Sequence, residues 1–150
     1  MKISTKGRYG LRILLDLALH TGDQPRMLHD VAESQGISEK YLSRLIIELR
    51  QAKLVQSVRG AKGGYRIARD PSQISVLEVV EVMEGPIGIV ECVEPEGVPR
   101  CGRIHSCAAR EMWEGVSALL RKSLQDVSLQ SIIDRQKEID SDLQCWDYCI

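Results

Sequence analysis

The hydrophobic positions of the sequence predict a mainly helical chain. In six stretches, apolar residues recur every three or four positions, which is the period of a helix with one buried face. These stretches are residues 9–19, 28–34, 38–49, 75–84, 107–124 and 129–139. Between the third and fourth stretches, residues 54–58 and 65–68 have the composition of short strands. We therefore expect one β-hairpin within an otherwise helical fold.

The hairpin follows directly on two short helices joined by a tight turn. The turn is Gln35-Gly36, and Ser38 is well suited to cap the helix after it. Ser75 and Ser106 are the corresponding cap candidates for the fourth and fifth helices. Two short helices with a glycine-containing turn are typical of a helix-turn-helix, although an ordinary helical hairpin has the same periodicity. The hairpin that follows favours a winged helix-turn-helix. The expected fold class is thus mainly α with a small β-hairpin wing, completed by a long dimerisation helix.

In such a fold, the second helix of the motif enters the major groove and points its N-terminal residues at base edges. Its polar residues are the candidate DNA contacts. They are Ser38, Lys40, Tyr41, Ser43 and Arg44.

The hairpin tip and the N-terminus supply further candidate contacts. Arg59 suits a narrow minor groove, and Lys62 suits a phosphate. The glycines at the tip permit a tight turn and a close approach of backbone to DNA. They are Gly60, Gly63 and Gly64. Lys6 could contact a phosphate as well, or it could be an ordinary solvated charge.

Composition and charge agree with a DNA-binding protein of this size. The 150 residues are 43% hydrophobic and 27% charged, enough for one packed domain with an appendage. Residues 1–70 carry 13 Lys and Arg against 7 Asp and Glu, whereas residues 71–150 carry 7 against 14. A basic half joined to an acidic half favours a DNA-binding module with a separate sensing or assembly part, although chance scatter of surface charge is the simpler alternative.

No apolar run approaches the ~20 residues of a membrane span, and the first residues lack a secretory signal, so we expect no membrane association and a cytoplasmic location. The expected organisation has four parts. They are a DNA-binding domain (1–70), a connecting helix with a cysteine-bearing loop (71–106), a dimerisation helix with a short final helix (107–140), and a tail (141–150).

Three cysteines form a cluster in the second half of the chain. The spacing is Cys92-x8-Cys101-x5-Cys107, whereas Cys145 and Cys149 lie near the C-terminus. Clustered thiols in a reducing compartment indicate metal or redox chemistry. Thiolates bind Fe–S clusters or zinc, and the spacing lacks the close cysteine pairs of structural zinc sites. Spacing favours Fe–S, with zinc and uncomplexed redox thiols left open.

The opening KISTKGRYGLR, the segment ISEKYLSRLIIELRQAKLVQSVRGAKGGYRIA and the three-cysteine loop resemble the winged-helix repressor family that includes IscR, NsrR, RirA and CymR. The resemblance covers about residues 1–140. It implies a homodimeric transcription factor, not an enzyme, that binds a pseudo-palindromic operator in double-stranded DNA. It also implies a cluster, 2Fe–2S in first place, that reports on iron, oxygen, nitric oxide or cluster supply.

The chain departs from the family pattern at the fourth cluster ligand. IscR-like members carry a histidine three residues after the third cysteine, where this chain has Arg110. NsrR-like members carry an acidic residue where this chain has Arg8. The candidates that remain are His105, then Glu111, with a loop glutamate, solvent or a residue of a partner subunit also open.

CymR-like members lack the cysteine loop and act in cysteine metabolism through a protein partner. The N-terminal segment and aromatic tail of this chain resemble that branch. The alternative function is therefore a cluster-free repressor controlled by a regulatory protein partner or by thiol oxidation. An electron carrier or Fe–S enzyme is disfavoured, because the sequence has no second cluster motif and no catalytic constellation.

Overall fold

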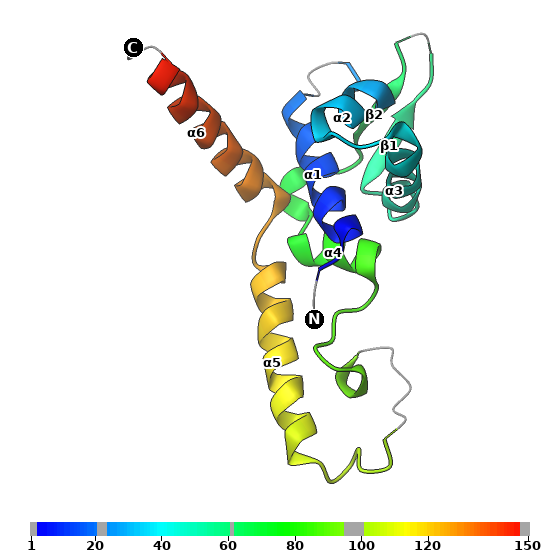
Figure 1. The fold of residues 1–150 in the computed structure, drawn as a ribbon, viewed down its shortest axis with the longest axis vertical. Coiled ribbons are helices and arrows are strands. Elements are labelled where there is room, and N and C mark those ends of the chain that lie inside the picture. Colours follow the sequence, from blue (N-terminus) through cyan, green and yellow to red (C-terminus); the bar gives the residue numbers. More distant parts are fainter. Residues whose placement is uncertain (1–2, 21–23, 61, 95–100, 148–150) are drawn as a thin grey trace.

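A computed structural model describes residues 3–20, 24–60, 62–94 and 101–147. These residues are mainly helical with one antiparallel pair of strands, which confirms the expected fold class. Figure 1 shows the order of the elements. They are α1 (Thr5–His20), α2 (Leu28–Gln35), α3 (Glu39–Gln51), β1 (Val55–Val58), β2 (Gly64–Ile67), η1 (Pro71–Gln73), α4 (Val76–Glu84), η2 (Glu91–Val93), α5 (Ala108–Gln125) and α6 (Leu129–Asp147).

Helix α1 is the centre of the packed body. It contacts α2, α3, α4, β2 and the start of α6. Its Ile13, Leu14 and Leu17 are fully buried. The predicted apolar stripe of α3 is buried in the same core and consists of Leu42, Leu45, Ile46 and Leu49. Burial of a large aliphatic side chain contributes about 1.5–3 kcal/mol, so this cluster holds α3 firmly against α1.

Two predicted helix caps are confirmed. The Ser38 hydroxyl accepts the backbone N–H of Tyr41 at 3.3 Å, and the Ser75 hydroxyl accepts that of Glu78 at 3.1 Å. At the end of α2, Gly36 adopts φ 63° and turns the chain toward α3. The helix-turn-helix is thus built from local signals that are visible in the sequence.

The first helix begins at Thr5, four residues earlier than its apolar period predicts. The cause lies 80 residues away, because the Glu84 carboxylate accepts the N–H groups of Ser4 at 3.1 Å and Gly7 at 2.9 Å. A distant carboxylate therefore caps α1 together with the local Ser4 hydroxyl, which accepts the Lys6 N–H at 3.0 Å.

The last two helices also differ from the expectation. Cys107, rather than Ser106, occupies the N-cap position of α5, and no side-chain hydrogen bond caps that helix. Helix α6, predicted to end at Ile139, continues to Asp147. Side-chain pairs one turn apart support this helix, and the last of them reaches into the extension. They are Gln130 with Asp134, Arg135 with Glu138, and Gln136 with Asp140.

Helices α1–α4 and the hairpin form one body, from which α5 and α6 extend in different directions (Figure 1). The first turns of α6 are anchored, with Leu129 at 0% and Ile133 at 4% exposure. Further along, Ile139 is 38% and Leu143 is 62% exposed.

Candidate nucleic-acid interface and cysteine segment

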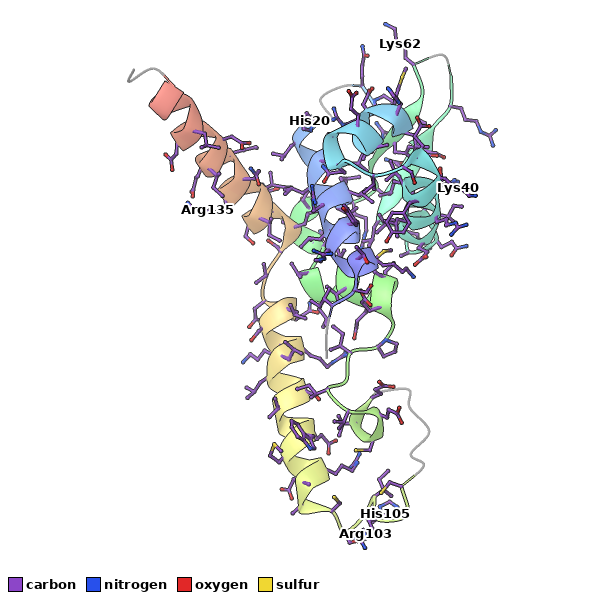
Figure 2. All side chains as sticks on the ribbon, in the orientation of Figure 1. His20, Lys40, Lys62, Arg103, His105 and Arg135 are labelled. Carbon is purple, nitrogen blue, oxygen red and sulfur yellow. The ribbon has the colours of Figure 1, made fainter. Side chains whose placement is uncertain are left out.

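Helix α3 presents one buried and one open face. Its apolar stripe is at most 1% exposed, as predicted. The opposite face carries Glu39, Lys40 and Arg44, all exposed, and Figure 2 shows Lys40 pointing away from the body. Lys40 and Arg44 are thus accessible to a nucleic acid without any change in packing.

Other predicted contacts on α3 already have intramolecular roles. The Ser38 hydroxyl caps the helix, and the Ser43 hydroxyl donates to the Glu39 carbonyl at 2.8 Å. Tyr41 is half-buried with its ring edge-on to Tyr9, the centroids 6.0 Å apart. Tyr41 therefore helps to hold α3 against α1.

Lys6 forms an ion pair across two helices. Its Nζ lies 2.9 Å from Glu48 Oε2, and the two side chains are 43% and 33% exposed. Such pairs contribute at most about 1 kcal/mol, so a DNA phosphate could replace Glu48 as the partner. The structure thus gives Lys6 a local role and leaves a phosphate contact as a proposal.

The hairpin has the expected wing geometry. Val55 pairs with Ile67 and Val58 with Gly64, in antiparallel register. At the tip, Gly60 adopts φ 122°, and the Gly63 N–H donates to the Gly60 carbonyl at 2.9 Å.

Two basic side chains are exposed at this tip, Arg59 and Lys62, and Figure 2 shows Lys62 at the outer end. A Cβ on Gly63 would lie 2.5 Å from the Val58 carbonyl oxygen, so the tight tip depends on glycine there. The wing therefore presents its basic residues on a defined turn beside α3.

One polar pair at the start of α3 was not predicted. The Nδ1 atom of His29 lies 3.0 Å from Oε1 of Glu39. This hydrogen bond and the charge of Glu39 raise the pKa of His29 above its usual 6.5. His29 looks like an ordinary helix-end residue in the sequence, because the contact spans the turn of the motif. When protonated, it compensates the acidic charge on the open face.

The first part of the predicted cysteine-bearing loop (residues 86–107, called the cysteine segment below) packs against α5. Ile87 is 2% exposed, and the Ile89 N–H donates to the Ser117 hydroxyl at 3.3 Å. The Arg110 Nε donates to the Cys92 carbonyl at 3.1 Å. Arg110, at the position where IscR-like members carry a ligand, thus holds the backbone of a candidate ligand.

The three clustered thiols do not form a ready-made metal site. Cys92 lies in η2, Cys107 lies at the N-cap of α5, and both are half-buried, whereas Cys101 is exposed. Among the described residues, no three His, Cys, Asp or Glu side chains gather closely enough to hold a metal ion.

The candidate fourth ligands are at the surface. His105 and Glu111 are both exposed, and Figure 2 shows His105 at the far end of the cysteine segment. Cys145 belongs to α6, and Cys149 lies outside the described residues.

A helix-turn-helix with an open basic face, followed by a basic glycine-tipped wing, defines a winged-helix DNA-binding regulator. The chain belongs to the Rrf2 family, described as iron-dependent transcriptional regulators, whose sequence model matches residues 3–135.

Named relatives agree with this assignment. The chain is 39% identical to the HTH-type transcriptional regulator CymR of Bacillus subtilis over 132 residues, 88% of this chain and 89% of CymR. It is 36% identical to IscR of Xenorhabdus nematophila over 140 residues, 93% of this chain and 84% of IscR. The structure of B. subtilis CymR, titled the global cysteine regulator, matches with a TM-score of 0.74 at 38% identity, covering 90% of this chain and 98% of CymR.

The relatives are named transcriptional regulators, so the chain is a DNA-binding transcription regulator and not an enzyme. Within the part of the chain that the structure describes, no helix is long and apolar enough to cross a membrane.

Proposed function

We propose that the protein is a homodimeric repressor that binds a pseudo-palindromic DNA site and responds to a signal at its cysteine segment. The observation that carries the DNA contact is the open face of α3 beside the wing. Lys40 and Arg44 would face the major groove, and Arg59 and Lys62 would reach the adjacent minor groove and backbone.

The dimer is supported by the surface of α5. Its exposed apolar side chains include Met112 (50%), Val116 (38%) and Leu119 (67%). Gly115 lies among them, and apart from its chain neighbours and the backbone of its own helix, a Cβ there would meet no atom of the single chain within 4 Å. An interior helical glycine costs about 1 kcal/mol, so its use fits a close approach by a helix of a second copy. A two-fold dimer would present two recognition helices to a palindromic site.

For the signal, we propose an Fe–S cluster, 2Fe–2S in first place, with Cys92, Cys101 and Cys107 as ligands and His105 or Glu111 as the fourth. Supporting it are the three thiols in one segment, the iron-dependent description of the family and the IscR relatives. When bound, such a cluster would supply an iron- and redox-sensitive centre. The described side chains stand apart, so the segment would have to close up to bind it.

The alternative is a repressor of cysteine or sulfur metabolism that uses no cluster. The contact between Arg110 and the Cys92 carbonyl favours it, because the position that carries a ligand in IscR-like proteins is engaged otherwise. A protein partner or thiol oxidation would then supply the signal.

The deciding experiment uses protein purified without oxygen. Visible absorption, iron and acid-labile sulfide are measured for the wild type, for Cys92→Ala and for the matched control Cys145→Ser. A coloured wild type with equal iron and sulfide, bleached only by Cys92→Ala, supports the cluster. A colourless wild type without iron refutes it and leaves the thiol- or partner-controlled repressor.

The DNA contact is tested separately with duplexes selected by the wild-type protein from a random pool. Arg59→Ala is expected to weaken binding by about tenfold or more. Arg135→Ala, at an exposed site on α6, is the control and is expected to bind like the wild type. Equal affinity for Arg59→Ala and the wild type would contradict the proposed wing contact.

A further inference from the structure

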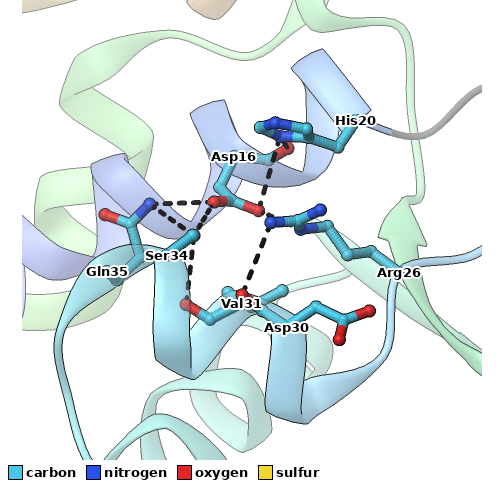
Figure 3. Close-up of polar contacts among 7 residues, drawn as sticks. All are labelled: Asp16, His20, Arg26, Asp30, Val31, Ser34 and Gln35. Carbon is cyan, nitrogen blue, oxygen red and sulfur yellow. Dashed lines mark hydrogen bonds and ion pairs between the residues drawn. The ribbon is translucent and has the colours of Figure 1, made fainter.

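One buried carboxylate contacts several parts of the DNA-binding module. Asp16, on α1, is 4% exposed (Figure 3). Its Oδ1 atom lies 2.6 Å from Nε of Arg26. Its Oδ2 atom accepts hydrogen bonds from the Ser34 hydroxyl and, at 2.9 Å, from the Gln35 amide. A carboxylate is stable in such a buried place only when it has partners of this kind, so the four side chains form one unit.

The backbone of Arg26 is bonded to the wing. The Arg26 N–H donates to the Tyr65 carbonyl at 3.0 Å, and the Tyr65 N–H donates to the Arg26 carbonyl at 2.8 Å. These two bonds form an antiparallel bridge beside β2. A Cβ on Gly64 would collide with the Arg26 carbonyl, so the close approach requires glycine. A hairpin of two strands is marginally stable alone, and the backbone of Arg26 adds a short third strand position beside β2.

The other partners of Asp16 lead to the recognition helix. Ser34 and Gln35 are the last residues of α2, directly before the left-handed Gly36. Two residues later, Ser38 caps α3. One carboxylate therefore holds both the segment that leads into α3 and the residue that pairs with β2 near the tip of the wing.

We propose that Asp16 is a positioning residue that sets the angle between the wing and the recognition helix. It acts through Arg26 and touches no DNA. Its side chain fixes Arg26, the backbone of Arg26 fixes β2, and β2 fixes the tip that carries Arg59. This inference deepens the proposed function, because its second test requires that Arg59 contact DNA.

The first test needs no DNA. Amide hydrogen exchange is compared for the wild type, Asp16→Asn and Arg26→Gln. Both variants are expected to speed exchange at the Tyr65 amide by about tenfold or more, with α4 amides unchanged, because local opening does not require global unfolding. Glu81→Gln is the matched control, since it breaks the ion pair between Glu81 and Arg121, which joins α4 to α5.

The second test measures whether the Asp16→Asn change weakens the contact between Arg59 and DNA. Arg59→Ala is combined with Asp16→Asn, and affinities are measured on a duplex selected by the wild type. If a displaced wing no longer delivers Arg59, the loss caused by Arg59→Ala falls from about tenfold in the wild type to less than about threefold in the variant. In the Glu81→Gln background, the loss stays as in the wild type.

Three results would overturn the inference. One is unchanged Tyr65 exchange in both Asp16→Asn and Arg26→Gln. Another is faster exchange spread evenly over α1–α4, or unfolding of both variants, since either shows that the pair stabilises the body as a whole. The third is an undiminished effect of Arg59→Ala in the Asp16→Asn background. If Arg59→Ala has no effect in the wild type, the proposed wing contact itself fails, while the exchange test still decides the role of Asp16 in wing order.

Discussion

Helices α3 and α5 both carry an apolar stripe, but the rest of the chain buries the stripe of α3 far more completely than that of α5. In α3, four apolar side chains are at most 1% exposed. In α5, which is five residues longer, only Ser117 is buried. Since amphipathic helices form in water mainly when a partner covers their apolar face, the two helices need different partners. The body of one chain covers the stripe of α3. In α5, Leu120 and Leu124 pack on the body, but Met112, Val116 and Leu119 stay exposed in the single chain, as the proposed dimer requires.

The largest expected effect is a change in the free energy of unfolding, tested by one Leu→Ala substitution in each of the two helices. Leu45→Ala in α3 is expected to lower the free energy of unfolding by about 2–5 kcal/mol, because it leaves a cavity in a full core. Leu119→Ala in α5 removes a side chain that is 67% exposed. Its effect should depend on protein concentration, as expected when the site is covered by a second copy. Denaturant unfolding at several concentrations measures both, and a concentration-independent loss of more than about 2 kcal/mol for Leu119→Ala would contradict the contrast.

Next in size is an effect on assembly. Gly115→Leu places a bulky side chain where the single chain has open space. We expect the fold to persist and the dimer dissociation constant to rise by about tenfold or more, since helices that cross at glycine cannot approach past a large residue. Sedimentation measures the change, with Ser123→Leu on the exposed last turns of α5 as the control. A dimer of unchanged affinity in Gly115→Leu would place the interface elsewhere.

A smaller effect is expected where the body meets the cysteine segment. Glu84→Ala removes the carboxylate that caps α1 beside the Ser4 hydroxyl, and it is expected to cost about 0.5–2 kcal/mol of unfolding free energy, whereas Glu84→Gln keeps an acceptor and should lose less. Amide exchange at Gly7 provides the local readout. If Gly7 exchanges equally in the two variants, the carboxylate does not cap the helix.

The smallest effect concerns pH. Glu39 raises the pKa of His29 above 6.5, so the attraction between the two is fully present below 6.5 and is lost as pH rises through the raised value. Because protonated His29 also lessens the negative charge on the open face of α3, DNA affinity should fall over the same interval. His29→Gln should flatten this dependence. An identical pH profile in the variant and the wild type would remove His29 from the interface.

The sequence predicted those parts of the molecule that local signals determine. The stripe of α3, the caps at Ser38 and Ser75, and the glycine tip of the wing all depend on residues within one or two turns. The contact between Glu84 and α1 and the contacts of Asp16 join residues up to 80 positions apart, and periodicity cannot detect them. An acidic residue inside an apolar helical stripe was the one available signal for Asp16.

In the candidate site, the sequence predicted the exposed basic residues but not the arrangement of the thiols, again because only the former depends on local signals. Exposure of Lys40, Arg44 and Arg59 follows from helix and hairpin geometry. The arrangement of the thiols depends on how a long segment packs, and spacing alone does not determine it. The hydrogen bond from Arg110 to the Cys92 carbonyl shows that part of this segment is held by contacts that no spacing rule contains.

The contact between Gly7 and Glu84 has a consequence for how the sequence can vary. A Cβ at position 7 would lie 2.6 Å from the Glu84 carboxylate oxygen, so a larger residue there requires a shorter or displaced side chain at position 84. Gly85, where the chain turns toward the cysteine segment, is the next residue. We therefore expect positions 7 and 84 to covary among related sequences, because a substitution accepted at one position restricts those open to the other.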